Sequence, residues 1–342
     1  MEAAAFHEAA TLSSAPIRAL NLSISGTWLE PVIQELLGEL QRLGIVRVRP
    51  RFYLSTEWGV PFNTIAVAIP FYLARPELIA LHKKRAGHVE GFDRSDILRY
   101  LRHEVGHVVN YAYRLYDDPA WVKLFGPITR PYQEDYRVEP FSRRYVRHLP
   151  GWYAQRHPDE DWSETFAVWM TPNTDWRVDY SHWPEALAKL EYCDRCMATL
   201  RDRDPIVTSA ELDEDVNELE YSLDKYYEAM ETAKSELPPG LDAMLNTIFY
   251  ESAGSEEDGH GLEQAAASAL MHKIEAELVA NIYHWTGHFP ERTRSLLRGL
   301  SERADALHKT YSIQEEFKTI IALTAFVTAL AMNYVRCGSY LP

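Results

Sequence analysis

The residues best suited to chemistry are His103, Glu104 and His107, which form an H-E-x-x-H pattern. Apolar residues recur at spacings of three and four across residues 95–116, and this periodicity predicts a helix. Side chains four residues apart lie on one face of a helix, so both imidazoles can reach a single metal ion. Glu104 would then lie beside the ion without binding it, where it can take a proton from water. The alternative is a surface helix with two solvated histidines, because patterns this short also occur by chance.

A catalytic zinc ion usually has three protein ligands and one position for water, so such a site needs a third ligand. The pattern with a third histidine after a glycine is excluded, because His107 is followed by Val-Val-Asn-Tyr-Ala-Tyr. A glutamate on a second helix is the other solution. Residues 157–170 offer one, since Pro158 and a run of acids mark a helix start. We predict that Glu164 is the third ligand.

The acids of this second helix also have other interpretations. Asp161-x-x-Glu164 is close to a capping box, in which Glu164 would cap the helix rather than bind a metal. The neighbouring acids fit the first turn of a helix, where negative charge is favourable; they are Asp159, Glu160 and Asp161.

Two blocks of the sequence, residues 102–107 and 142–170, resemble a family of bacterial zinc-binding metallopeptidases of the gluzincin type. The resemblance covers roughly residues 25–200, and its second block is long and much more specific than H-E-x-x-H alone. Two features depart from the family. The chain lacks a cysteine-rich zinc ribbon at its start. It also has Val168 where thermolysin-type gluzincins carry an aspartate, four residues after the glutamate ligand.

The resemblance implies a zincin fold and one Zn²⁺ per chain. It also implies that His103, His107 and Glu164 are the zinc ligands and that Glu104 is the catalytic general base and acid. No further cofactor is expected. These implications agree with the interpretation drawn from the residues themselves.

The order of the remaining elements predicts an α+β fold. A helix over 28–43 and strands over 45–54 and 63–73 precede the H-E-x-x-H helix, and the pattern is helical from about residue 184 onward. We therefore expect a zincin-like catalytic domain, with a small sheet, an active-site helix and a glutamate helix, followed by a mostly α-helical C-terminal region. The expected divisions are a flexible arm at 1–20, the catalytic domain at 21–204 and the helical domain at 205–342. The helices expected after the catalytic core are at 185–202, 209–236, 241–251, 261–285, 291–308 and 313–336.

The connection between the two site helices, residues 116–160, is irregular and rich in proline and aromatic residues, so it should wall the cleft. Zincins commonly use a Tyr or His to stabilise the developing oxyanion. Tyr153 and His157 are the first candidates, ahead of Tyr136, Tyr145 and His148, although packing roles are also open to all of them. The strand at 63–70 is our candidate for pairing with an extended substrate.

Composition and cysteine content limit the partners and the compartment. The net charge of −15 argues against general nucleic-acid binding. Three cysteines and the lack of a secretory signal favour the cytoplasm, and Cys193 and Cys196 are expected to be reduced thiols. The uncharged stretch 319–335 favours a buried or dimer-forming helix over a membrane span. His284 and His288 repeat the histidine spacing, but Trp285 replaces the base.

The function expected from these features is that of a zinc-dependent metallopeptidase acting on peptide or protein substrates. No signature for binding a free amino terminus is found, which favours an endopeptidase. One alternative is a latent zincin scaffold whose helical C-terminal half binds a partner or senses a signal. Another is a zinc hydrolase of a non-peptide amide, because the same chemistry cleaves any polarised amide.

Overall fold

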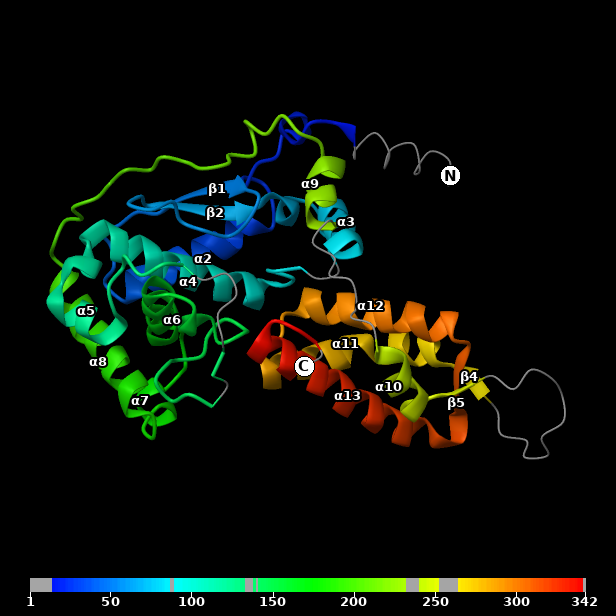
Figure 1. Ribbon diagram of the computed structural model, residues 1–342. Helices are drawn as coiled ribbons and strands as arrows, with labels where there is room; N and C mark the ends of the chain where they lie inside the picture. Colours follow the sequence, from blue (N-terminus) through cyan, green and yellow to red (C-terminus); the bar gives the residue numbers. More distant parts are fainter. Residues whose placement is uncertain are drawn as a thin grey trace, which may run out of the picture. The chain divides into compact units, whose positions relative to one another are not determined.

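The computed structural model describes residues 14–86, 89–132, 138–139, 141–231, 240–251 and 264–340. The chain forms two compact units, residues 1–232 and 233–342 (Figure 1). The described part is mostly helical with two small sheets, as the α+β prediction requires. The unit boundary follows residue 232 rather than residue 204. Tyr136 and most of the expected N-terminal arm lie outside the described residues.

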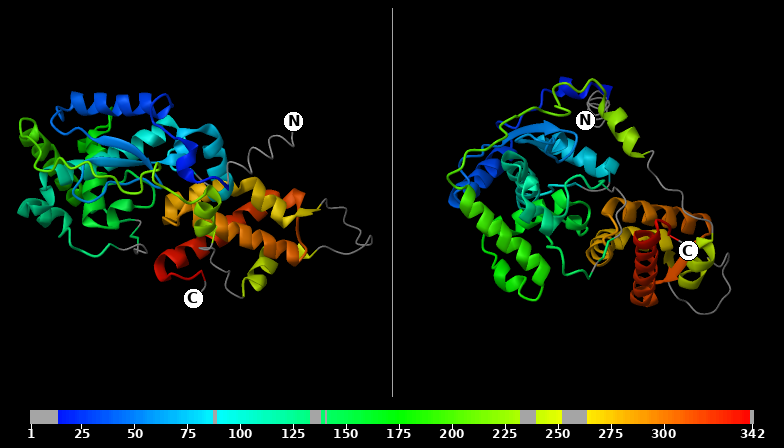
Figure 2. Two further views of the ribbon diagram at one scale, coloured as in Figure 1. Left: turned by 90° about the horizontal axis from the view of Figure 1, so that it is seen from above. Right: turned by 60° about the vertical axis from the view of Figure 1, so that its left-hand side comes forward.

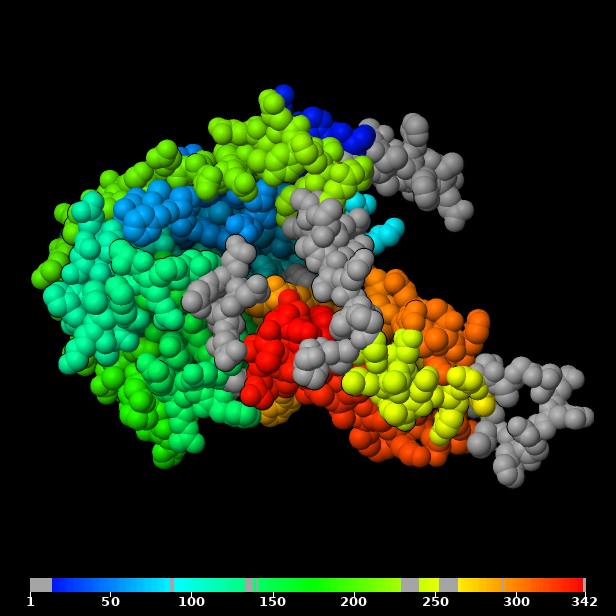
Figure 3. Space-filling view, viewed as in Figure 1, coloured from blue at the N-terminus to red at the C-terminus, as the bar shows by residue number. Residues whose placement is uncertain are grey.

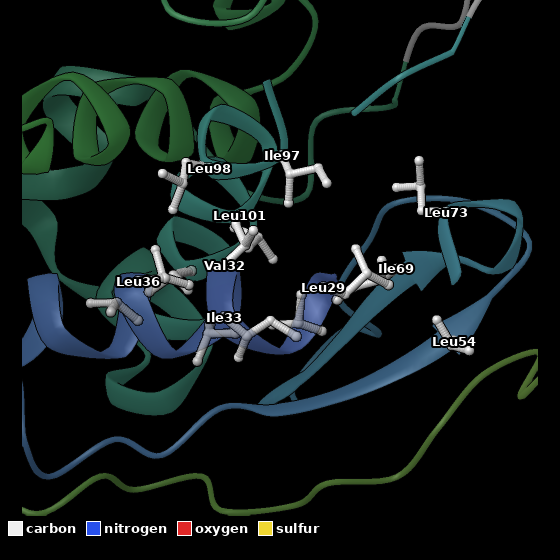
Figure 4. Packing of buried hydrophobic residues seen from close by; sticks show 14 of the residues in the cluster. Leu29, Val32, Ile33, Leu36, Leu54, Ile69, Leu73, Ile97, Leu98 and Leu101 are labelled. Atoms are coloured by element: carbon white, nitrogen blue, oxygen red, sulfur yellow. The ribbon is translucent and has the colours of Figure 1, made fainter. Parts of the chain in front are cut away.

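The core of the first unit lies between two helices and a parallel strand pair. Helix α2 (Leu29–Arg42) packs against α4 (Arg94–Tyr113), while β1 (Arg51–Ser55) pairs with β2 (Ala66–Pro70) in the register Arg51–Ala66. Side chains from all of these elements point toward one another in Figure 4, where the labelled residues include Leu29, Val32, Leu36, Leu54, Ile69, Leu98 and Leu101. Their burial removes apolar surface from water and fixes α4 in place.

Helix α6 (Pro158–Met170) crosses α4 at very close range. A Cβ atom on Gly106 would lie 2.7 Å from the Cα of Ser163, so only glycine fits at this crossing. The indole nitrogen of Trp162 donates to the carbonyl oxygen of Gly106 at 2.8 Å and fastens the two backbones together. The predicted H-E-x-x-H helix and glutamate helix are therefore both present and in direct contact.

The other elements of the first unit surround this pair. Helices α3 and α5 were not predicted. The elements are η1 (Ile17–Leu20), η2 (Phe71–Ala74), α3 (Pro76–Ala86), η3 (Leu115–Asp117), α5 (Pro119–Phe125), η4 (Tyr153–Gln155), α7 (Trp176–Asp179), α8 (Pro184–Leu200) and α9 (Leu223–Glu231).

Residues 205–222 form an extended segment, which we call the strap. It runs along the outside of the first unit from α8 to α9 (Figure 2) and lies at the surface next to β1 in Figure 3. Ile65 N–H donates to the carbonyl of Ser209 at 2.7 Å, and Val216 N–H donates to that of Leu54 at 3.0 Å. The prediction of a helix over 209–236 is wrong for this segment, because its backbone groups bond to the sheet region instead.

In the second unit, the described residues 240–251 and 264–340 form four helices and a small antiparallel sheet with the strand order β3-β5-β4. The four predicted helices are confirmed, whereas the short strands were not anticipated. The elements are α10 (Leu241–Ile248), β3 (Tyr250–Glu251), β4 (Gln264–Ala266), α11 (Ala267–Thr286), α12 (Pro290–Ala306), β5 (Lys309–Ser312), η5 (Ile313–Glu315) and α13 (Glu316–Cys337).

Helix α13 is apolar along most of its length. Within the span Ile313–Cys337, the most apolar 18 residues have a mean hydropathy of 1.6, and 22% of this stretch is buried. By length and composition alone, the helix is long and apolar enough to cross a membrane. One face, which includes Leu323 and Val327, is buried in the core of the second unit. The opposite face leaves Phe317 77% exposed. The expected burial of this helix therefore applies to one face.

Candidate metal centre

His103, His107 and Glu160 form a buried group whose ligand atoms all lie within 4.8 Å of one another. The Nε2 atoms of the two imidazoles are 3.2 Å apart. The Oε2 atom of Glu160 lies 3.0 Å from the Nε2 atom of His103 and 3.2 Å from that of His107. Two histidines and one carboxylate are a donor set that suits a zinc ion with an open fourth position.

The opposite nitrogen of each imidazole has a carboxylate beside it. Glu164 Oε1 lies 2.9 Å from Nδ1 of His103. Asp159 Oδ2 lies 3.0 Å from Nδ1 of His107, although off the direction of a good hydrogen bond. Such partners favour a proton on Nδ1 and leave the Nε2 lone pairs available for a metal ion. The donor arrangement thus fits a metal ion.

The carboxylates that surround the imidazoles also stabilise protonated histidine. Burial lowers the pKa of His103, but the hydrogen bonds to Glu160 and Glu164 outweigh it and raise the pKa to about 9. Burial likewise opposes the pKa rise of His107, which Asp159 and Glu160 cause. A cation that binds here therefore competes with protons.

Glu164, which the sequence predicts as the third ligand, lies one helical turn after Glu160 and outside the group of possible ligand atoms. Its carboxylate lies at the Nδ1 side of His103 and accepts hydrogen bonds from the backbone N–H groups of His148 and Leu149, at 3.0 and 2.9 Å. The carboxylate that lies at the two Nε2 atoms is that of Glu160.

Glu104 lines the same cleft and is 4% exposed. Burial raises the pKa of its carboxyl to about 7, while the neighbouring imidazoles act in the opposite direction. A carboxylate with a pKa near neutrality can both accept and return a proton at physiological pH. The role of general base and acid that the sequence indicates for Glu104 stays a prediction.

The cleft has a volume of about 510 Å³ and opens beside the segment 57–60. The carbonyl of Gly59 accepts a hydrogen bond of 2.8 Å from Ala68 N–H, so this segment pairs with β2 on the side away from β1. The prediction that strand 63–70 forms the substrate edge therefore does not fit, because β2 is flanked on both sides. Phe62 and Ile128 add apolar surface to the cleft.

Two of the predicted oxyanion candidates are occupied elsewhere. His157 caps α6: its Nδ1 accepts from the Asp159 backbone N–H at 3.2 Å, and its Nε2 lies 2.8 Å from the Arg130 carbonyl. His148 Nε2 lies 2.9 Å from the carbonyl of Arg99, and the residue does not line the cleft.

Tyr153 stays the candidate for the oxyanion role. It lines the cleft, and its ring lies edge-on to His103 with the ring centres 5.4 Å apart. Tyr132, which the sequence did not single out, donates to Oε1 of Glu160 at 2.9 Å. No local pattern marks Tyr132, since it lies in an irregular segment far from both site helices in sequence. Tyr145 lies against Lys189 and is a packing residue.

The acids predicted for the first turn of α6 lie there, and all of them are buried. Asp159 also accepts hydrogen bonds from Asn110 at 2.6 Å and from Tyr111. Asp161 forms an ion pair of 2.6 Å with the buried Lys189 of α8. Each carboxylate therefore has its own cationic or hydrogen-bonding partner, and together these contacts set the rotation of α6.

The other histidine and cysteine patterns do not form comparable groups among the described residues. His288 is buried and lies 2.7 Å from the Thr293 hydroxyl. Cys193 and Cys196 are free thiols on α8, and burial raises the pKa of both.

Comparison with known proteins gave no match: no protein-family model, no curated protein and no solved structure was found to be similar to this chain.

Proposed function

We propose that this protein is a zinc-dependent peptide hydrolase with His103, His107 and Glu160 as metal ligands. The observation that supports this most directly is the buried His–His–Glu group in a cleft that also contains the buried carboxylate of Glu104. Two histidines and one glutamate are the ligand set of several zinc peptidases. The zincin fold inferred from sequence resemblance belongs to the same proposal.

A zinc ion held by His103, His107 and Glu160 would act as a Lewis acid, which would polarise a carbonyl group and acidify a water molecule. Glu104 takes a proton from the attacking water and passes it to the leaving amine, for which its raised pKa of about 7 is suitable. The Tyr153 hydroxyl donates a hydrogen bond to the oxygen on which negative charge develops. Glu164 and Asp159 keep the two imidazoles in their orientation.

The segment 57–60 supports a peptide as the substrate. Backbone groups of successive residues in an extended chain point to alternate sides. Gly59 pairs with Ala68, and its two neighbours Trp58 and Val60 both line the cleft. A peptide can therefore add to this edge through main-chain hydrogen bonds, and Phe62 offers an apolar contact for one of its side chains.

The test combines metal content with hydrolysis of a fluorogenic peptide library. We expect about one zinc per wild-type chain and a strong loss of zinc in Glu160→Gln. Glu104→Gln should keep the zinc and lose hydrolysis, whereas the exposed Glu185→Gln should match the wild type. Full hydrolysis by Glu104→Gln would contradict the mechanism. Full zinc content in Glu160→Gln would contradict the ligand set.

A second candidate function concerns the C-terminal unit, which would bind a partner and regulate the first unit. The exposed apolar face of α13, including Phe317 and Ile321, supports it. The discriminating truncation belongs after residue 232, because the strap packs on the first unit. A rise in hydrolysis by this fragment would support regulation, and unchanged hydrolysis would argue against it.

A further inference from the structure

A hydrogen-bonded chain of three cleft residues ends on the proposed ligand Glu160. Arg156 Nη1 donates to the Tyr153 hydroxyl at 3.1 Å. The hydroxyl oxygens of Tyr153 and Tyr132 are 3.3 Å apart, and Tyr132 donates to Oε1 of Glu160 at 2.9 Å. All four residues line the same cleft.

The chemistry of its two ends gives this chain one direction. A guanidinium group can only donate, and a carboxylate can only accept. Since Tyr132 uses its single proton on Glu160, it can only accept from Tyr153. Tyr153 in turn accepts from Arg156, so its own proton points away from Arg156 and into the cleft.

Local structure holds Arg156 in this position. Tyr153 begins the turn η4, and Arg156 follows it by three residues, which places both side chains on one side of the turn. The guanidinium group lies over the Tyr132 ring at 4.4 Å and over the Tyr153 ring at 5.3 Å. Such contacts between a cation and aromatic faces restrict the conformation of the arginine.

We propose that Arg156 is a positioning residue that obliges the Tyr153 hydroxyl to donate into the cleft, and that it thereby makes the space beside Glu160 a binding site for an anionic oxygen. Within this series of hydrogen bonds, Tyr153 donates to the neutral hydroxyl of Tyr132 over a long distance of 3.3 Å. A charged oxygen is a stronger acceptor and displaces Tyr132 as the partner of Tyr153. In a hydrolase this oxygen is the oxyanion of the tetrahedral intermediate, so the inference deepens the proposed function and rests on it.

Two other roles for Arg156 give different results in a double-mutant cycle. If it acts only through its positive charge, its removal weakens anion binding equally with or without the Tyr153 hydroxyl. If it acts only in packing, anion binding does not depend on it. If it acts through Tyr153, the two losses overlap and are not additive.

The experiment uses the full chain with cobalt in place of zinc and inorganic phosphate as the oxyanion probe, followed by visible absorption. We expect Arg156→Gln and Tyr153→Phe each to weaken phosphate binding about tenfold. The double variant should be no more than about threefold weaker than either single variant. Additive losses, or no loss in Arg156→Gln, would overturn the proposal.

Two matched variants complete the test. Tyr132→Phe removes the hydroxyl that competes for the Tyr153 proton, so it should bind phosphate at least as well as the wild type while binding zinc more weakly. Arg156→Lys keeps the charge and a donor and should retain part of the affinity. Weaker phosphate binding in Tyr132→Phe would count against the direction of the chain. The phosphate assay involves no peptide, so it tests this inference separately from the proposed function. If the variants bind phosphate as expected but the wild type cleaves no peptide, the proposed function is contradicted and the role of Arg156 is not.

Discussion

Replacement of Gly106 by alanine tests whether the close crossing of α4 and α6 sets the geometry of the metal site. In an ordinary helix interior this change stabilises a protein by about 0.5–1 kcal/mol. At Gly106 the new Cβ would lie 2.7 Å from the Cα of Ser163, a backbone atom that cannot rotate away. Carbon atoms prefer a separation of about 3.5 Å, so α6 must move by roughly 0.8 Å.

This displacement should affect both stability and metal affinity. Overpacking of a core costs about 1–3 kcal/mol, which outweighs the gain from removing a helical glycine. Metal sites tolerate ligand displacements of only about 0.2 Å, so a shift of Glu160 should weaken zinc binding by at least about tenfold. Urea unfolding and competition with a chromophoric zinc chelator measure the two effects.

Gly38 provides the matched control. It lies in helix α2, and the nearest atom to a Cβ at this position is the end of the flexible Arg42 side chain at 3.8 Å. Gly38→Ala should therefore stabilise the protein by about 0.5–1 kcal/mol and leave zinc affinity unchanged. A Gly106→Ala variant that is as stable as Gly38→Ala and binds zinc like the wild type would refute the reasoning.

Four further predictions concern buried groups around α6 and the metal site. Burial lowers the pKa of His148 to about 4, below its ordinary value of 6.5. The unfolded chain therefore binds the proton more readily than the folded chain, so stability should fall by about 1–3 kcal/mol as pH drops from about 6.5 to 4. His148→Asn should lose this pH dependence in urea titrations at several pH values. Lys189→Met leaves Asp161 buried without its ion-pair partner and should cost about 3–5 kcal/mol, while a second change, Asp161→Asn, should recover part of that loss; a double variant no more stable than Lys189→Met would argue against the pairing. Asp159→Asn and Glu164→Gln should each weaken zinc binding about 10–100-fold without abolishing it, and unchanged affinity in both would mean that the imidazoles do not depend on these partners. Removal of zinc by a chelator should lower the melting temperature of the first unit and not of the second, because the ligands all belong to the first; calorimetry that shows both transitions moving together would contradict this.

The two site helices could be predicted from sequence because their signals are local. Asp93 caps α4 by accepting from the Asp96 backbone N–H at 2.9 Å, and Pro158 occupies the first turn of α6. The spacing of His103 and His107 then places both imidazoles on one face. None of these features requires knowledge of the rest of the chain.

The choice between Glu160 and Glu164 could not be made in this way. Residues four apart share a helix face, so periodicity treats the two glutamates alike. They differ by about 6 Å along the axis of α6. Only the height at which α6 crosses α4, fixed by the contact of Gly106 with Ser163, decides which carboxylate faces the Nε2 atoms. That contact joins residues 57 apart in sequence, and no local pattern reports it.

The prediction of a helix over the strap was wrong for a related reason. Its acids and scattered apolar residues resemble an amphipathic helix, and the Thr208-x-x-Glu211 spacing suggests a cap. Its backbone groups nevertheless bond to Leu54 and Ile65, partners about 150 residues away in sequence, as tertiary hydrogen bonds override a weak local preference. Only from Leu223 onward, where α9 begins, does the predicted helix form.

The arrangement of α6 also explains why so many carboxylates can share one buried helix. Unpaired, each buried charge would cost several kcal/mol, and mutual repulsion would add to this cost. Asp159 and Glu164 each meet an imidazole, Asp161 meets Lys189, and Glu160 faces both imidazoles and accepts from Tyr132. Every one of these acids thus has a specific cationic or donor partner outside α6. A rotation of α6 would break all of these contacts at once. The electrostatic pairing that offsets the cost of burying these charges therefore also fixes the orientation of α6, and with it the position of Glu160.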